Sequence, residues 1–302
     1  MEFIDDGRLA KSSRDLYNRK LAQFIGFLPA TRQSIDFIVD NPGLAVEALH
    51  KEKSISQSAT NRHLFYSAVV AYLLHVPAGQ RRAARIKQKW LEIQKANWED
   101  HRAADMEELS DKAKAVVAAV KWKDVVAMRD KLPLGSDERL LLALYTYLPP
   151  VRADYFEVVI NPPKSLIEKT KRNYLVLRDD GSGLLVLRNF KTAARYKEIR
   201  HELEGELLQE IHASLELNPR RFLFVMATDP KEAPSRDGFS KWANRVLKDL
   251  FKVPLTLTSL RHLFISTLDF THMRAADLER VARMMGHGIA IQKEYQWLES
   301  GD

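Results

Sequence analysis

Three groups of side chains near the C-terminal end of the chain are suited to phosphate chemistry. They are the Arg261-His262 pair, the Gly286-His287 pair and Tyr295. Arginine is a permanent cation whose planar fork can hold two phosphate oxygens at once. Histidine can donate or accept a proton near neutral pH, and a tyrosine hydroxyl can act as a nucleophile if a neighbour takes its proton. Brought together, these residue types would suit covalent attack on a phosphodiester.

Each of these groups, taken alone, has a simpler structural explanation. A single arginine on a helix is usually a solvated charge, a Gly-His pair is usually a helix end, and a tyrosine near a terminus usually packs against apolar neighbours. Their order and spacing favour the functional interpretation. The LRH run at 260–262, the MGH run at 285–287 and Tyr295 together resemble the C-terminal signature of the tyrosine recombinases, also called the phage integrase family.

Two helices are predicted to carry this signature. Apolar residues recur at helical spacing over 260–268, so this segment would present Arg261 from a helix. A second amphipathic helix over 277–285 would deliver His287. Gly286 is its natural C-terminal cap, because glycine tolerates the left-handed conformation that ends many helices.

A further cation is predicted at a fixed corner of the backbone. Ser136 begins a capped and strongly apolar helix, SDERLLLALYTYL, which Pro149 and Pro150 end. Arg152 follows at once, and Asp154 could orient its guanidinium. A surface-turn arginine is the simpler alternative. In the resemblance, Arg152 matches the first catalytic arginine of the family, which likewise follows an apolar helix.

Alternating hydrophobicity predicts three short strands in the middle of the C-terminal part. Segments 173–177 and 184–190 flank the sequence DDGSG, a strong hairpin signal, and a third strand is expected near 196–199. Lys191 would then lie at the exit of a strand. The family places a catalytic lysine in this three-stranded element, and Lys197 is the competing candidate.

The resemblance implies a role for each residue type. The tyrosine would attack a DNA phosphate, two arginines would hold its non-bridging oxygens, and the lysine would protonate the departing 5′ oxygen. His287 would hydrogen-bond the phosphate or help the nucleophile. The family usually has a histidine three residues before the second arginine, where this chain has Thr258, a hydrogen-bond donor that cannot act as a general acid or base near pH 7. The predicted catalytic residues are Arg152, Lys191, Thr258, Arg261, His287 and Tyr295.

This chemistry would leave a 3′-phosphotyrosyl link and a free 5′-hydroxyl. Because the energy of the ester is kept in that link, rejoining would need no ATP. Two arginines would do the charge work that a metal ion otherwise does, so neither a metal nor another cofactor is expected.

Composition agrees with a nucleic-acid partner. A length of 302 residues suits two domains, and a hydrophobic content of 45% supports real cores. The formal net charge of +7 favours a polyanion, most simply DNA. The absence of cysteine excludes disulfides and thiolate metal sites. No signal peptide and no apolar run of membrane-spanning length is recognised, so an intracellular, DNA-associated protein of the cytoplasm, nucleoid or nucleus is expected.

The first third of the chain is predicted to be helical and resembles the core-binding domain of the family. Helices are expected over 12–28, 34–39, 44–50 and 54–76. The polar start of the last helix suits phosphate contacts or an ordinary solvated face equally well. A dense basic run follows at 81–95, and a basic amphipathic helix is expected over 238–251. The DNA-binding candidates on these segments are Asn61, Arg62, Arg81, Arg82, Arg85, Lys87, Lys89, Lys241 and Arg245.

A reversal of charge predicts the domain boundary. Residues 97–111 turn acidic and lack apolar periodicity, which is typical of a linker. The expected organisation is a helical core-binding, DNA-binding domain over 1–103, a linker over 104–115 and a catalytic domain over 116–302. The fold class would be mainly α with a small antiparallel sheet, combining a helical N-terminal domain with a mixed α/β catalytic domain.

The resemblance implies a site-specific recombinase or integrase of a mobile element or virus. Double-stranded DNA would be the partner, and four protomers would act on two DNA sites. A type IB topoisomerase-like nicking-closing enzyme shares this chemistry and would relax DNA as a monomer. A DNA-binding protein with a decayed site is the non-enzymatic alternative, which Thr258 makes conceivable.

Overall fold

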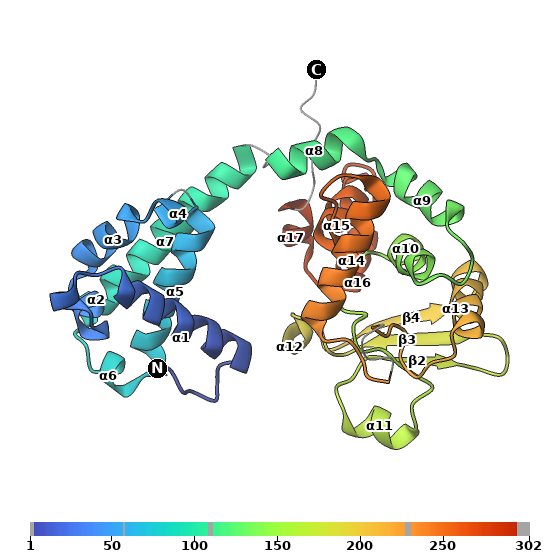
Figure 1. Ribbon diagram of the computed structural model, residues 1–302, viewed down its shortest axis with the longest axis horizontal. Helices are drawn as coiled ribbons and strands as arrows, with labels where there is room; N and C mark the ends of the chain where they lie inside the picture. The colour runs from blue at the N-terminus through green and yellow to red at the C-terminus, as the bar shows by residue number, and fades with distance from the viewer. Residues whose placement is uncertain (1–2, 57, 108–110, 227–230, 295–302) are drawn as a thin grey trace. The chain divides into compact units, whose positions relative to one another are not determined.

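The computed structural model describes residues 3–56, 58–107, 111–226 and 231–294. The chain divides into two compact units, Met1–Glu108 and Leu109–Asp302 (Figure 1). None of the described helices is both long and apolar enough to cross a membrane.

The N-terminal unit is entirely helical in its described part. Helix α5 packs against both α1 and α7, and Phe24, Phe65 and Trp90 belong to the core of this unit with no exposed surface. The indole N–H of Trp90 donates to the carbonyl of Val39 at 3.0 Å, so the ring is both buried and satisfied. The helices are α1 (Lys11–Gly26), α2 (Ile35–Asp40), α3 (Pro42–Lys51), α4 (Lys53–Ser56), α5 (Ala59–His75), α6 (Pro77–Gln80) and α7 (Ala84–Glu107), with a 3-10 turn at Ala30–Arg32.

One expectation for this unit needs correction. The helix expected over 54–76 is interrupted, because Ser58 adopts an extended conformation and its hydroxyl accepts the backbone N–H of Asn61 at 3.2 Å. This is N-capping, for which serine is a preferred residue. The boundary between the two units falls within the segment 104–115 that was expected as a linker, where α7 ends at Glu107 and the next helix begins at Asp111.

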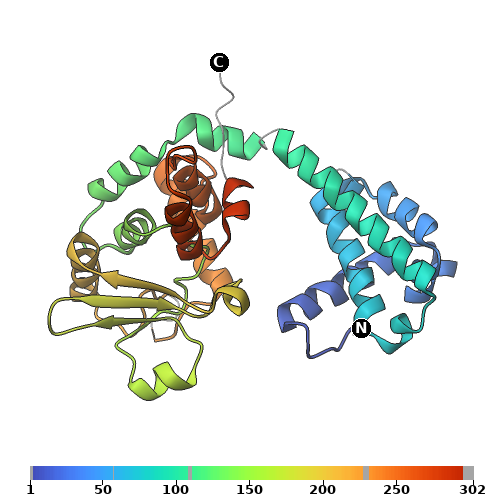
Figure 2. The same cartoon turned by 180° about the vertical axis from the view of Figure 1, so that it is seen from behind.

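The C-terminal unit combines helices with a small sheet. The sheet lies between two groups of helices in both ribbon views (Figures 1 and 2). Helices α10 and α14–α16 lie on one side of it, and α11 lies on the other. The helices are α8 (Asp111–Ala119), α9 (Trp122–Lys131), α10 (Asp137–Tyr147), α11 (Lys164–Lys169), α12 (Ala193–Tyr196), α13 (Gly205–Leu217), α14 (Arg236–Phe251), α15 (Leu257–Ile265), α16 (Ala275–Met284) and α17 (Ile289–Glu294).

The sheet has four strands in the order β1-β2-β3-β4. They are β1 (Val159–Ile160), β2 (Tyr174–Leu177), β3 (Gly183–Leu187) and β4 (Ile199–Leu203). The predicted hairpin is confirmed, with β2 and β3 antiparallel. The sheet is mixed rather than purely antiparallel, because β1 pairs with β2 in parallel. The segment predicted as the third strand starts too early: residues 193–196 form α12, where the Ala-Ala-Arg sequence has high helix propensity, and β4 begins only at Ile199.

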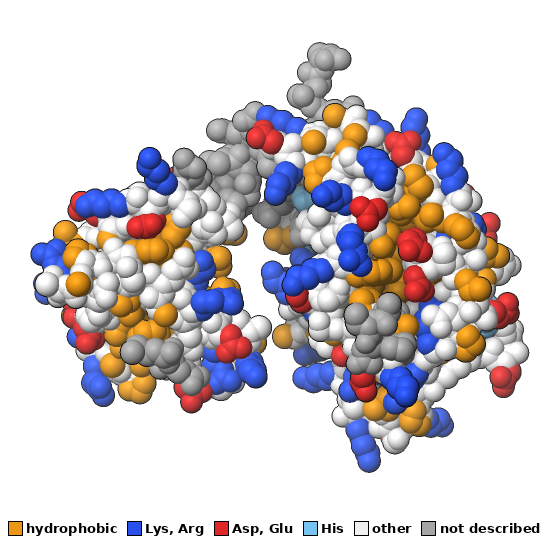
Figure 3. All heavy atoms as spheres, viewed as in Figure 1, with side chains coloured by type: hydrophobic (Ala, Val, Ile, Leu, Met, Phe, Trp, Pro, Cys, Tyr) orange, Lys and Arg blue, Asp and Glu red, His pale blue; other side chains and the backbone are white. Residues whose placement is uncertain are grey.

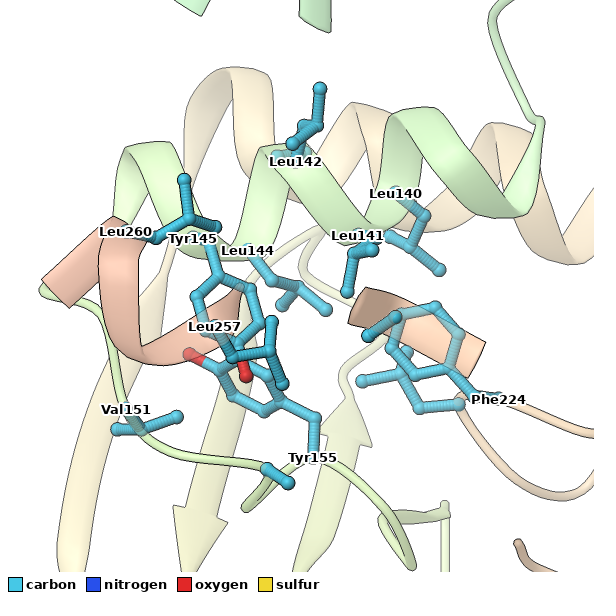
Figure 4. Close-up of a cluster of buried hydrophobic side chains, with 14 of the residues drawn as sticks. Leu140, Leu141, Leu142, Leu144, Tyr145, Val151, Tyr155, Phe224, Leu257 and Leu260 are labelled. Carbon is cyan, nitrogen blue, oxygen red and sulfur yellow. The ribbon is translucent and has the colours of Figure 1, made fainter. Parts of the chain in front are cut away.

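Helix α10 forms the centre of the C-terminal core. Ser136 caps it as predicted, accepting the backbone N–H of Arg139 at 3.2 Å. The rings of Tyr145 and Tyr155 meet edge to face at 5.3 Å between centroids. Leu257 and Leu260 of α15 pack into the same cluster (Figure 4). The corner that follows α10 is therefore held against a close-packed core.

A buried ion pair joins α10 to α13. The guanidinium of Arg139 donates through Nε and Nη2 to both carboxylate oxygens of Glu210, at 2.8 to 3.0 Å. Its Nη1 donates to the carbonyl of Leu132 at 2.9 Å. Glu210 is 5% exposed, so removal of its charge would leave the guanidinium without a counterion in a poorly solvated position.

Substitution of this carboxylate should destabilise the unit without touching the candidate site. Glu210→Gln is expected to lower the free energy of unfolding by about 3 kcal/mol, and the double change Arg139→Met with Glu210→Leu should restore most of that stability. Urea unfolding measures both. Glu216→Gln, on the exposed side of α13, is the matched control and should change stability by less than about 0.5 kcal/mol. A Glu210→Gln protein as stable as the wild type would contradict the assignment.

Candidate functional site

Arg261 is a fully buried cation with three identified acceptors. Its Nη1 donates to the carbonyls of Pro150 at 2.7 Å and Met285 at 3.1 Å, and its Nη2 donates to Nδ1 of His287 at 2.8 Å. A buried guanidinium is tolerated only when such acceptors surround it. The side chain of Arg261, a candidate from the LRH run, therefore lies inside the unit. Its hydrogen bonds link the Arg152 corner to the His287 turn.

The turn that carries His287 is a Schellman motif at the end of α16. The N–H of His287 bonds to the carbonyl of Ala282 at 3.0 Å, and the N–H of Gly286 bonds to that of Arg283 at 2.9 Å. Gly286 has φ +70, the left-handed conformation that this motif requires, which confirms the predicted cap. The imidazole is therefore placed by backbone geometry, in a fixed position after the helix.

The bond from Arg261 also determines the protonation of His287. A guanidinium can only donate, so Nδ1 of His287 must accept, and a neutral ring then carries its proton on Nε2. Burial lowers the pKa of His287 to about 3, with further contributions from the charges of Arg261 and Arg152. His287 is therefore a neutral hydrogen-bond donor through Nε2 at physiological pH, which excludes a role as a resting imidazolium acid.

Arg152 lies at the corner predicted after α10. The hydroxyl of Tyr145 donates to its carbonyl, and its backbone N–H donates to Oδ2 of Asp154 at 3.1 Å. Arg261 donates to the carbonyl of Pro150, two residues before Arg152, and also to His287, so it joins the corner that carries Arg152 to the His287 turn.

Asp154 has a different partner from the one expected. Its Oδ1 forms an ion pair with the guanidinium of Arg236, at the start of α14, and Arg236 also donates to the carbonyl of Asn189 at 2.9 Å. Asp154 thus binds the backbone of Arg152 and the side chain of Arg236. Neither Arg236 nor Tyr145 is identifiable from the sequence, because a polar residue beside a helix start or an aromatic on an apolar helix has many ordinary uses.

Lys191 lies on an exposed turn directly beside the His287 turn. The hydroxyl of Thr192 donates to the carbonyl of Gly286 at 2.6 Å. A methyl group on Gly286 would lie only 3.3 Å from the ring of Phe190, so both neighbours of Lys191 contact this glycine. The competing candidate, Lys197, directs its ammonium group to the carbonyl of Ala194 at the end of α12, at 3.3 Å.

The two remaining catalytic candidates are Thr258 and Tyr295. Thr258 is exposed in the first turn of α15, three residues before Arg261. Tyr295 lies outside the described residues, immediately after α17. In the described parts of the chain, no group of three or more His, Asp or Glu side chains is arranged to hold a metal ion.

The DNA-binding candidates fall into two groups by their present contacts. Some are engaged within their own unit: Arg82 pairs with Asp36 and Asp40, Lys87 donates to the carbonyl of Gln80, Arg62 donates to Asn97, and Lys241 pairs with Asp237. The others are exposed side chains, namely Asn61, Arg81, Arg85, Lys89 and Arg245. Figure 3 shows Lys and Arg side chains spread over the visible face of each unit.

Comparisons with known proteins add one structural likeness. The sequence matches no known protein family and no curated protein. Among solved structures, a crystal structure of XerA recombinase is similar over 97% of this chain and 89% of that chain, with 15% sequence identity and a TM-score of 0.42.

Neutral buried histidines should make stability depend on pH below about 6.5. Burial also lowers the pKa of His201 to about 4. Both rings stay neutral in the folded protein but take up a proton in the unfolded chain near pH 6.5, so the unfolded state binds more protons and stability falls as pH decreases from 6.5 to 4.5. In His287→Asn, which keeps an acceptor for Arg261, the slope should decrease by up to about 1.4 kcal/mol per pH unit.

The measurement is urea unfolding at several pH values between those limits. His212→Asn, on the exposed side of α13, is the control and should leave the slope unchanged. An unchanged slope in His287→Asn would mean that this histidine is not held neutral.

Proposed function

We propose that this chain is a tyrosine-type, site-specific DNA recombinase that cuts and rejoins duplex DNA through a 3′-phosphotyrosyl intermediate. The observation that carries the proposal is the link that Arg261 makes between the corner carrying Arg152 and the turn carrying His287, with the Lys191 turn packed against Gly286. These groups come from four separate segments, in the chain order of the family signature.

The charges of the site favour a phosphodiester. Arg261 is bonded to the corner that carries the second permanent cation, Arg152, and the imidazole of His287 adds a donor but no negative charge. Arg152 follows a packed corner, so little reorganisation of this corner would be needed when charge develops on the phosphate oxygens. Such preorganised donors are worth on the order of 10²–10³ each in rate.

A division of roles follows from the positions of the groups. Tyr295 would attack phosphorus, and the P–O bond to the 5′ oxygen would break as Lys191 donates a proton to that oxygen. The tyrosine proton would pass to water. His287 would donate from Nε2 to a non-bridging oxygen, and Thr258 could add one hydrogen bond. Reversal of these steps by a 5′-hydroxyl would reseal the strand without ATP.

The most direct test of this proposal is covalent trapping on DNA. The probe is a pool of short duplexes of random sequence, each carrying a nick that lets the cleaved fragment diffuse away. Wild-type protein should form an adduct that survives denaturing electrophoresis, and Tyr295→Phe should bind the pool but form none, because phenylalanine lacks the attacking oxygen. An adduct with Tyr295→Phe would remove this tyrosine from the mechanism.

The same experiment separates the alternatives. Adduct formation with relaxation of supercoiled plasmid by a monomer would favour a topoisomerase-like enzyme. DNA binding without any adduct would favour a DNA-binding protein with a decayed site. Adducts on the two strands of paired DNA sites, with four protomers present, would support the recombinase.

DNA binding by the N-terminal unit has its own test. Changing the exposed cations Arg81, Arg85 and Lys89 to Gln should weaken binding to all sequences and reduce the log–log salt slope by about 0.9 for each phosphate that is no longer neutralised. A matched triple change of exposed cations outside the run, at Lys11, Arg19 and Lys51, should leave the slope unaltered. Equal slopes for wild type and the first triple variant would place this run away from DNA.

A further inference from the structure

A buried amide joins the segments that carry two of the proposed catalytic cations. Asn173, directly before β2, has no exposed surface. Its Oδ1 accepts the backbone N–H groups of Arg188 and Asn189, both at 2.7 Å. Its Nδ2 donates to the carbonyls of Asp154 at 2.7 Å and Asn189 at 3.3 Å. These four bonds use the full hydrogen-bonding capacity of the amide.

The position of these bonds gives them their importance. The β2–β3 and β3–β4 ladders both end at or before Leu187, so the backbone beyond that residue no longer has a strand partner. Buried backbone groups need partners, and Asn173 supplies them from a side chain. Asp154 is two residues from Arg152, and Asn189 is two residues from Lys191. The amide therefore spans the gap between the corner and the turn.

Arg236 reinforces the same connection from the surface. Its guanidinium pairs with the carboxylate of Asp154 and donates to the carbonyl of Asn189, so both segments are linked twice. The guanidinium also lies over the ring of Phe156, 4.6 Å from its centroid. Since Arg236 is only half-buried while Asn173 is fully buried, the amide is the more constrained of the two links.

Two other contacts connect the His287 turn to the Arg152 corner and to the Lys191 turn. Arg261 ties the carbonyl of Pro150 to the His287 turn, and Thr192 ties the Lys191 turn to Gly286. The remaining side, between the Arg152 corner and the Lys191 turn, is spanned by Asn173 and Arg236.

We infer that Asn173 is a positioning residue that fixes the Lys191 turn against the Arg152 corner. The inference rests on the proposed function, in which Arg152 holds phosphate oxygens while Lys191 protonates the leaving oxygen of the same phosphate. A displacement of about 1 Å between such groups can cost on the order of 10²-fold in rate.

The first readout does not require catalysis. Asn173→Asp keeps the size and the acceptor but replaces the donor with an oxygen that faces two carbonyls. Backbone amide exchange in the full chain should become faster in peptides covering 150–156 and 186–192, and stay unchanged in α13. Glu210→Gln is the control, because it weakens the link from α10 to α13 instead. Unchanged exchange in both segments would overturn the inference, as would faster exchange throughout the unit.

The second readout separates positioning from general destabilisation. On the nicked duplex pool, Asn173→Asp should cleave about 10²-fold more slowly than wild type while binding DNA equally well. A duplex whose 5′ bridging oxygen is replaced by sulfur releases a thiolate, which needs no proton from Lys191. Most of the rate should be recovered on this substrate, as in Lys191→Ala. Equal reductions in rate on the two substrates would overturn the inference.

The results distinguish failure of the recombinase proposal from failure of the positioning role of Asn173. If wild-type protein forms no adduct, the recombinase proposal is wrong, and amide exchange still decides whether Asn173 holds the two segments. If wild type cleaves DNA while Asn173→Asp matches it in exchange and in rate on both substrates, the positioning role alone is wrong.

Discussion

The buried guanidinium of Arg261 is the interaction on which the C-terminal unit depends most. A permanent cation without exposed surface would cost several kcal/mol if its donors lacked acceptors. Its acceptors here come from the corner after α10 and from the turn after α16, the first of them 111 residues away in the chain. The same charge that holds these segments together also sets the proton on His287, so structure and proposed chemistry share one group.

The buried Arg261 guanidinium affects the other residues of the candidate site. His287 is neutral because it faces a donor in a buried position, and it therefore leaves the positive charge of the two arginines in place for an anion. The Lys191 turn is packed against the glycine that ends α16, which makes the position of that lysine depend on the Schellman motif. Asn173 and Arg236 then complete the connection back to Arg152. A shift in any one segment would be transmitted to the others through buried polar contacts.

Local signals explain which parts of this arrangement were predictable from the sequence. The serine cap and the two prolines define α10 and its corner, and a glycine before His287 predicts the end of α16. Ser58 shows the limit of periodicity, because apolar spacing continues through a position where a side chain caps a new helix. Residues 193–196 show a second limit, because high helix propensity forms a short helix where a turn was expected, and the strand expected near 196–199 begins only at Ile199.

Long-range partners were not predictable in the same way. Asp154 could be expected to meet a guanidinium, but nothing local distinguishes Arg152 from Arg236, which is 82 residues away. In the sequence, Asn173 is one polar residue beside a strand. Only the fold shows that its side chain bonds to the segments containing Asp154 and Asn189. The resemblance supplied the roles of the catalytic candidates, whereas the geometry supplied the contacts that hold them.

In the proposed reaction, this site transfers a DNA 3′-phosphate to Tyr295. Mass spectrometry of the nuclease-trimmed covalent complex tests it most directly, because it identifies both the modified residue and the end of the DNA strand that is attached. We expect a nucleotide joined through its 3′-phosphate to the peptide containing Tyr295, with a 5′-hydroxyl on the released strand. A nucleotide on another residue, or a 5′-phosphate on the released strand, would contradict it.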